Sequence, residues 1–121
     1  MDMPAPDATI LARRDRIIAR LAAVLPADAL ITDPVETRAY ECDALTAYRC
    51  LPLAVVLPRT TEEVAAVMRE CHAEGVKVIP RGAGTSLSGG ALPLADAVLL
   101  GLGKFKRVLD IDYEDRVAVV Q

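Results

Sequence analysis

Aromatic side chains and histidine are scarce in this chain of 121 residues, which has no Trp, one Phe, three Tyr and one His. Hydrophobic residues make up 53% of the chain and aromatic residues only 3%, so a core must be built from Val, Leu, Ile and Ala. The three cysteines form no C-x-x-C pair. With only His72 besides them, neither a zinc site nor an iron–sulfur site is expected, and we expect free thiols of a cytoplasmic protein.

An excess of positive charge is also missing, because the formal net charge is -3. Nucleic-acid-binding domains usually carry a basic face, and membrane-surface binding usually needs a basic cluster, so neither class of partner is expected. The N-terminus lacks the basic and apolar regions of a secretion signal. No apolar run approaches the ~18 residues of a membrane-spanning helix, so no transmembrane segment is predicted.

Residues 1–50 are predicted to form a helical extension. Apolar residues recur at helical spacing over residues 7–25, with Asp7 as the N-cap and Pro26 after the end. The charged residues fall mostly outside the apolar positions of this helix: Arg13, Arg14, Asp15, Arg16 and Arg20.

A second, short helix is predicted near 34–40, where Asp33 precedes Pro34 in a capping pattern. Residues 40–52 show no period and are interpreted as an ordered connection. Its polar side chains either line a site or lie on a surface loop: Asp43, Thr46, Tyr48 and Arg49.

From residue 53 a strand–helix–strand unit is predicted. The run LAVVL (53–57) lies between two prolines and is typical of a buried strand. A helix follows, with Thr60 and Glu63 as a capping box and Gly75 as its left-handed stop. The apolar face of this helix is predicted to hold Val64, Val67, Met68 and Cys71. The next strand is VKVI (76–79), and the two strands should be parallel with a right-handed crossover.

The remaining pattern favours an α+β fold with mixed or antiparallel strands. AVLLGL (97–102) and residues 108–111 read as strands, 112–116 as a turn, and VAVVQ (117–121) as a further strand. The acidic run around that turn is expected to be a hairpin turn and not a metal site. Because the chain ends inside an apparent strand, we expect it to be the N-terminal part of a longer protein.

The stretch PRGAGTSLSGG, residues 80–90, holds four glycines, two serines and a threonine directly after a buried strand. Ligands of open α/β folds bind beyond the carboxyl ends of parallel strands, where glycine amides and hydroxyls approach an anion closely. A diphosphate-containing cofactor is therefore the expected ligand. Arg81 would meet either a phosphate or a neighbouring carboxylate. The alternative is a glycine-rich loop with a purely structural role.

Two familiar phosphate motifs do not fit this stretch. A G-x-G-x-x-G fingerprint from Gly82 needs glycine where Leu87 stands, and a helix where a strand follows. A P-loop needs lysine where Gly90 stands. The predicted cradle therefore consists of backbone amides and hydroxyls without a helix N-terminus.

The combination LAVVLPRTTEEVAAVMRECHAEGVKVIPRGAGTSLSGGALPL resembles the N-terminal half of the FAD-binding domain of the vanillyl-alcohol-oxidase/para-cresol-methylhydroxylase (PCMH-type) superfamily. The preceding YECDALTAYR makes it similar to the FAD subunit of glycolate oxidase, a D-lactate dehydrogenase-like group. The resemblance covers roughly residues 35–121. It implies an incomplete PCMH-type domain over 51–121, preceded by the extension 1–50.

The resemblance also implies the cofactor and its contacts. In such domains the segment that matches Pro80, Arg81, Gly82, Ala83, Gly84, Thr85 and Ser86 wraps the FAD pyrophosphate, and Gly89 and Gly90 continue that wall. The segment around Pro58 would lie near the nucleotide end. Catalytic residues and the substrate-binding cap come later in the family's sequences, so no catalytic residue is expected here, and neither His72 nor a cysteine is assigned that role.

The implied reaction oxidises a 2-hydroxy acid, glycolate or D-lactate, to the 2-oxo acid by hydride transfer to the flavin. Implied partners are other glycolate oxidase subunits, including an iron–sulfur subunit. The protein would then be cytoplasmic, or it would be bound at the inner membrane through these partner subunits. Two alternatives stay open: a flavoenzyme of the same fold with a different substrate, and a truncated, non-catalytic fragment.

Overall fold

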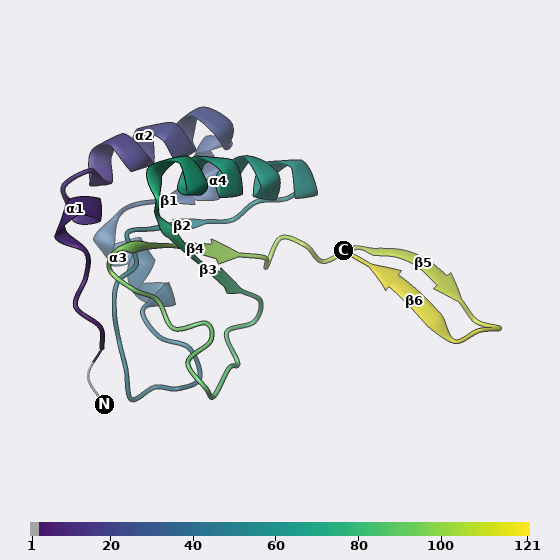
Figure 1. The fold of residues 1–121 in the computed structure, drawn as a ribbon. Coiled ribbons are helices and arrows are strands. Elements are labelled where there is room, and N and C mark those ends of the chain that lie inside the picture. Colours follow the sequence, from purple (N-terminus) through teal and green to yellow (C-terminus); the bar gives the residue numbers. More distant parts are fainter. Residues whose placement is uncertain (1–2) are drawn as a thin grey trace.

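A four-stranded sheet in the order β1-β2-β4-β3 forms the centre of the computed structural model, which describes residues 3–121 (Figure 1). Its strands are β1 (Leu30–Ile31), β2 (Ala54–Val56), β3 (Lys77–Arg81) and β4 (Ala97–Gly101). β2 and β3 each pair in parallel with β4, whereas β1 is antiparallel to β2. The predicted parallel relation of β2 and β3 is confirmed, but β4 lies between them.

The burial of each strand agrees with its place in the sheet. Every residue of β4 is buried, as its unbroken apolar run requires for a strand covered on both faces. β3 is an edge strand and is only partly buried. The core is aliphatic, as predicted, and its largest fully buried apolar side chains include Ile17, Leu21, Val55, Val56, Val67, Val98 and Leu99.

Helices cover one face of the sheet, where α2 and α4 lie side by side (Figure 1). The helices are α1 (Ala8–Leu11), α2 (Arg14–Val24), α3 (Pro34–Thr37) and α4 (Thr61–Glu74), with 3₁₀ turns at Ala27–Ala29 and Arg38–Tyr40. Asp7 caps α1 by accepting a hydrogen bond from the Thr9 amide at 2.8 Å. The helix predicted over 7–25 is present but divided into α1 and α2, because the Arg13 amide bonds to the Ile10 carbonyl and tightens the backbone between them.

The ends of α4 form as predicted, but its buried face differs. Thr60 Oγ1 accepts from the Glu63 amide at 3.2 Å, and Gly75 ends the helix at φ +66°. Met68 was expected on the apolar face, yet it is 47% exposed. The buried stripe passes from Val67 through Cys71 to Glu74, and one residue beyond Val67 the helix has already turned about 100° away.

Glu74 is a buried carboxylate that joins α4 to the N-terminal helices. Its side chain is 2% exposed and lies 3.0 Å from Arg13, 2.9 Å from Arg16 and 3.5 Å from Arg20. Arg13 and Arg16 donate hydrogen bonds to the Glu74 carboxylate, whereas Arg20 donates to Glu70 and lies near Glu74 as an ion pair. These arginines therefore help to attach the N-terminal helices to α4.

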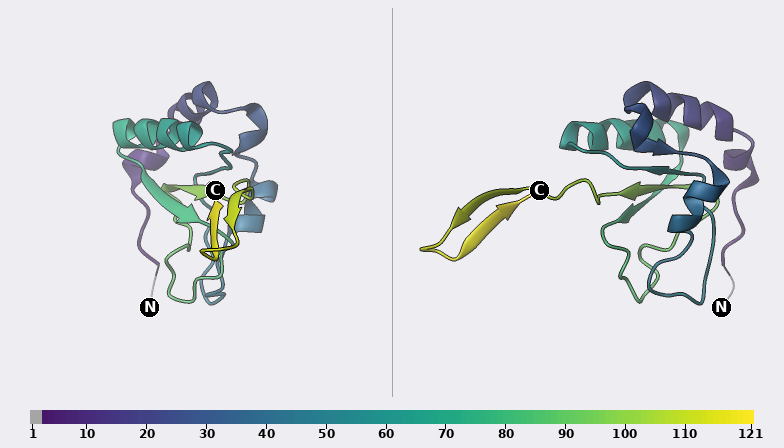
Figure 2. Two further views of the ribbon diagram at one scale, coloured as in Figure 1. Left: turned by 90° about the vertical axis from the view of Figure 1, so that its right-hand side faces the viewer. Right: turned by 180° about the vertical axis from the view of Figure 1, so that it is seen from behind.

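Two irregular segments, 41–53 and 82–96, run side by side on the other side of the sheet, below it in Figure 1. The views of Figure 2 agree with this placement, and a hydrogen bond from the Ala44 amide to the Gly84 carbonyl, 2.9 Å long, joins them. The connection before β2 is therefore ordered, as predicted, and it contacts the glycine-rich stretch.

The last two strands, β5 (Val108–Asp112) and β6 (Val117–Val120), form an antiparallel hairpin that extends away from the body (Figures 1 and 2). The predicted turn is confirmed, and Asp112 Oδ1 accepts there from the amides of Glu114 and Asp115. Every residue from 108 to 120 is exposed, including the apolar ones. Along residues 3–121 no helix is both long and apolar enough to cross a bilayer.

Candidate functional site: a loop of unpaired backbone amides

The strand β3 continues through Pro80 and Arg81, which pair with Leu100 and Gly101 of β4. The glycine-rich loop therefore starts at Gly82, two residues later than the sequence pattern indicates. Pro80 fits within a strand here because β3 is an edge strand, where a missing amide hydrogen need not interrupt a ladder.

The first half of the loop, Gly82–Ser86, leaves its backbone amides without partners among the described residues. Among residues 3–121 none accepts a hydrogen bond from the five consecutive amides of this segment. Gly84 has φ +74°, a conformation that glycine adopts without strain. A Cβ at Gly82 would meet no atom within 4 Å, so the space beside it is open. Ala83 and Thr85 are exposed as well.

The second half of the loop closes on itself. Ser86 Oγ accepts from the Gly90 amide at 3.2 Å and from the Ser88 amide at 3.4 Å. The Leu92 amide donates to the Gly89 carbonyl at 3.2 Å, and Gly89 has φ +78°. Gly89 and Gly90 therefore form a turn that supports the open half of the loop.

Arg81 is buried, and its guanidinium bonds to the protein backbone. It is 7% exposed, and its guanidinium donates to the carbonyl oxygens of Tyr40 at 3.2 Å and of Ala91 at 2.5 Å. Burial lowers the pKa of Arg81 below its ordinary value, and the charge of Asp43 raises it in part. The hydrogen bonds of Arg81 within residues 3–121 thus go to backbone carbonyl groups, and which of the two expected partners it meets, phosphate or carboxylate, stays a prediction.

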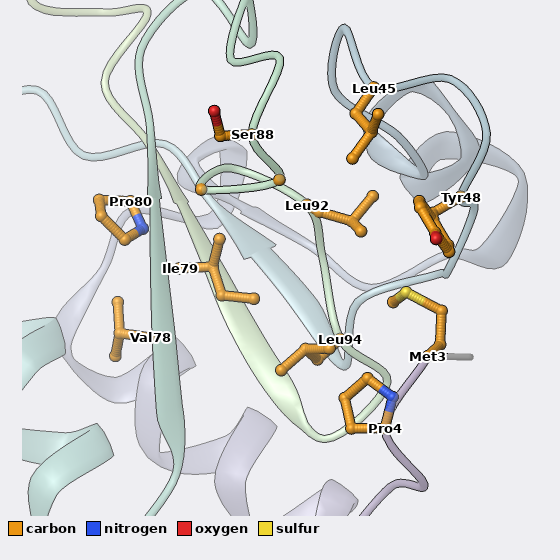
Figure 3. Close-up of a pocket in the computed structure, with 12 residues that line it drawn as sticks. Met3, Pro4, Leu45, Tyr48, Val78, Ile79, Pro80, Ser88, Leu92 and Leu94 are labelled. Atoms are coloured by element: carbon orange, nitrogen blue, oxygen red, sulfur yellow. The ribbon is translucent and has the colours of Figure 1, made fainter. Parts of the chain in front are cut away.

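A cavity of about 410 Å³ lies beside the loop, along β3 (Figure 3). Figure 3 shows Leu45 and Tyr48 of the connection on one side and Val78, Ile79 and Pro80 on the other. The remaining lining residues are Met3, Pro4, Ser88, Gly89, Gly90, Leu92 and Leu94. Of the described residues that line it none carries a charged side chain, so this cavity is a largely apolar neighbour of the amide loop.

Other candidates from the sequence lie elsewhere. His72 is exposed on α4, and Cys71 is buried in the core, where burial raises the pKa of its thiol to about 11. Pro58 is buried just after β2, at the edge of the sheet where β3 also ends. Within residues 3–121 no group of three or more His, Cys, Asp or Glu side chains comes together as metal ligands would.

The sequence pattern missed how the connection contributes to the loop. Ala44 donates to Gly84, and a Cβ at Gly89 would lie 3.6 Å from Leu45 Cδ2. Asp43 Oδ1 accepts from the Leu45 amide at 2.9 Å, a local turn of a kind that an Asp two residues before an apolar residue can form. Asp43 was the one residue in the sequence that indicated a turn here. A turn residue alone does not indicate which distant segment the turn contacts.

The open half of the loop fits the diphosphate of FAD. Five unpaired amides follow the end of a parallel strand, and a glycine with open space beside it leaves room for a close anion. Thr85 is exposed in the same segment, and its hydroxyl group is a further hydrogen-bond donor for an anion.

Comparison with known proteins gives the same assignment. Residues 52–121 match the family model described as FAD binding domain. The glycolate oxidase subunit GlcD of Escherichia coli (strain K12) is 56% identical over 82 residues, which are 68% of this chain and 16% of that protein. The D-2-hydroxyglutarate dehydrogenase of Xanthomonas citri pv. viticola is 37% identical over 107 residues, which are 88% of this chain and 23% of the relative.

Solved structures share the fold. A 4-ethylphenol oxidase from Gulosibacter chungangensis superposes with a TM-score of 0.78 at 25% identity over 96% of this chain and 23% of that one. An alkyldihydroxyacetonephosphate synthase superposes with a TM-score of 0.77 at 21% identity over 100% of this chain and 24% of that one. The amide loop after β3 thus lies within a recognised flavin-binding fold, and the chain belongs to the FAD-binding domain family, with FAD as its cofactor.

Proposed function

We propose that this chain supplies the pyrophosphate-binding part of the FAD site in an oxidoreductase. The amides of Gly82, Ala83, Gly84, Thr85 and Ser86 would hold the diphosphate, with Gly89 and Gly90 continuing the wall and Pro80 and Arg81 setting the start of the loop. The observation that carries this proposal is the run of five consecutive amides without partners in the described chain. Such amides bind an anion without a change in their own hydrogen bonds.

We further propose that the full-length protein oxidises a 2-hydroxy acid, glycolate or D-lactate, to the 2-oxo acid. The names of the relatives support this substrate class, although the chain spans only 16% and 23% of the two described above. When bound, FAD supplies the hydride acceptor. Residues 80–90 contain no carboxylate, histidine or lysine, so this loop binds and orients while the proton is taken elsewhere.

We also propose the division of the chain and its setting. Residues 51–121 would begin the FAD-binding domain, and residues 1–50 would be an extension packed on it through α2 and β1. The relative from E. coli is named as a subunit, which supports partner subunits for this protein as well. We propose an iron–sulfur subunit among them. Such partners would leave the protein in the cytoplasm or bound at the inner membrane.

The test is to purify the full-length protein and record its visible spectrum before and after adding FAD. We expect the absorption bands of oxidised flavin, and bleaching of those bands by glycolate or D-lactate in the absence of an acceptor. A colourless protein that takes up no FAD would refute the site. Flavin that neither acid reduces would instead favour the alternative of a different substrate, since solved structures of this fold include a 4-ethylphenol oxidase.

A further inference from the structure

Two charged groups beside the amide loop are buried. Asp43 is 5% exposed and Arg81 is 7% exposed, and Asp43 Oδ2 and Arg81 Nε are the two buried side-chain atoms of the described chain that lack a hydrogen-bond partner. Buried charges are costly unless an opposite charge compensates them. Asp43 comes from the connection before β2, and Arg81 is the last residue of β3.

The backbone around this pair joins the connection to the loop. Arg81 Nη1 donates to the Tyr40 carbonyl, and the Ala44 amide donates to the Gly84 carbonyl. Arg81 Nη2 donates to the Ala91 carbonyl at the far end of the loop. Arg81 therefore contacts the connection and the far end of the loop, and its position fixes both.

Gly84 packs directly on this arginine. A Cβ at Gly84 would lie 3.5 Å from Arg81 Cδ and 3.8 Å from Arg81 Nε. The left-handed turn at Gly84, which orients the open amides, thus lies against the stem of Arg81. The charge of Asp43 acts on the same guanidinium and opposes the effect of burial on its pKa.

We propose that Asp43 and Arg81 form a buried positioning pair that fixes the amide loop for the cofactor's phosphates. Asp43 lies outside the matched FAD-binding segment, which starts at residue 52, so the connection becomes a working part of the cofactor site. The pair touches no phosphate itself. It acts through the backbone of Gly82–Ser86. This proposal therefore rests on the proposed FAD site.

The test is to measure the dissociation constant of FAD for the full-length apoprotein with Asp43→Asn. Removing a negative charge near a bound diphosphate should strengthen binding if charge alone mattered. A positioning role predicts the opposite sign, and we expect the dissociation constant to rise at least tenfold. The titration is done at a temperature well below the unfolding midpoint of each apoprotein. Almost all of the protein is then folded, so a loss of overall stability does not lower the measured affinity.

Glu41→Gln is the matched control. Glu41 is a carboxylate of the same connection, and it pairs with Arg49, whose side chain is 63% exposed. We expect less than a twofold change in FAD affinity for it. In the double variant Asp43→Asn/Arg81→Gln, the loss should not exceed that of the worse single variant, because the two residues act as one unit.

Unchanged or tighter FAD binding by folded Asp43→Asn would overturn the pair while leaving the proposed FAD site intact. A wild-type protein that binds no FAD would refute the site itself. If Asp43→Asn does not fold, Arg81→Lys provides the test, because it keeps the charge but loses the fork that reaches two carbonyl groups. We expect at least a tenfold loss there too, and wild-type affinity would overturn the pair.

Discussion

The two halves of the glycine-rich loop have similar compositions but opposite hydrogen bonding. Gly82–Ser86 leaves its amides without partners among the described residues, whereas the segment from Ser86 to Leu92 bonds to itself through Ser86 Oγ and the Gly89 carbonyl. One half therefore offers donors to a ligand, and the other supplies a fixed turn. Glycine content marks both halves as flexible, and only the hydrogen bonds tell the binding half from the supporting half.

The largest expected effect comes from Gly84→Val in the open half. Gly84 has φ +74°, which is costly for a β-branched residue, and its Cβ would face the Arg81 side chain at 3.5 Å. We expect the full-length protein to lose bound flavin entirely, measured as the ratio of flavin to protein after reconstitution. Gly103→Val is the control, because a Cβ at Gly103 would meet no atom within 4 Å and this glycine has no positive φ. Wild-type flavin content in the Gly84 variant would contradict the close approach.

A sharper test of the open half is Gly82→Ala. The new methyl group would enter open space, so the free energy of unfolding of the apoprotein should change by less than about 0.5 kcal/mol. The same methyl group would stand where an anion approaches, and we expect FAD to bind about tenfold more weakly, or about 1.4 kcal/mol. Denaturant unfolding and FAD titration separate the two quantities. Unchanged affinity would mean that the cofactor does not approach Gly82.

The smallest effects should separate Ser86 from Ser88. Ser86→Ala removes the acceptor of the Gly90 amide and should lower both apoprotein stability and FAD affinity by about 0.5–1.5 kcal/mol. The Ser88 hydroxyl makes no hydrogen bond within residues 3–121, so Ser88→Ala should leave apoprotein stability unchanged. It should cost about 0.5–1.5 kcal/mol of FAD affinity alone. Equal losses of stability in the two variants would contradict the supporting role of the Ser86 hydroxyl.

Local signals in the sequence predicted the elements that carry this site. The apolar run of β4, the caps of α4 and the turn at 112–116 each depend on neighbouring residues, and each formed as expected. The ends of the strands depend on their partners and not on neighbouring residues alone. β3 continues through Pro80 because its pairing with β4 decides where it ends.

Contacts between distant segments could not be predicted in the same way. Nothing near Asp43 indicates that it will face Arg81, and nothing near Glu74 indicates that three arginines will surround it. The order of strands, with β4 between β2 and β3, likewise depends on how the whole chain packs. The loop residues were found because glycine and hydroxyls gather in one short stretch, but which of their amides are open is a property of the fold.

Three guanidinium groups surround the single carboxylate of Glu74, where the N-terminal helices attach to α4. Substitution of one arginine and substitution of Glu74 therefore have unequal effects on this attachment. Loss of any one arginine leaves the carboxylate with two others, so the contact has reserve on that side. Loss of the carboxylate leaves Arg13 and Arg16 without their acidic partner, whereas Arg20 keeps its contact with Glu70. A change of the anion therefore disturbs this junction more than a change of any one cation.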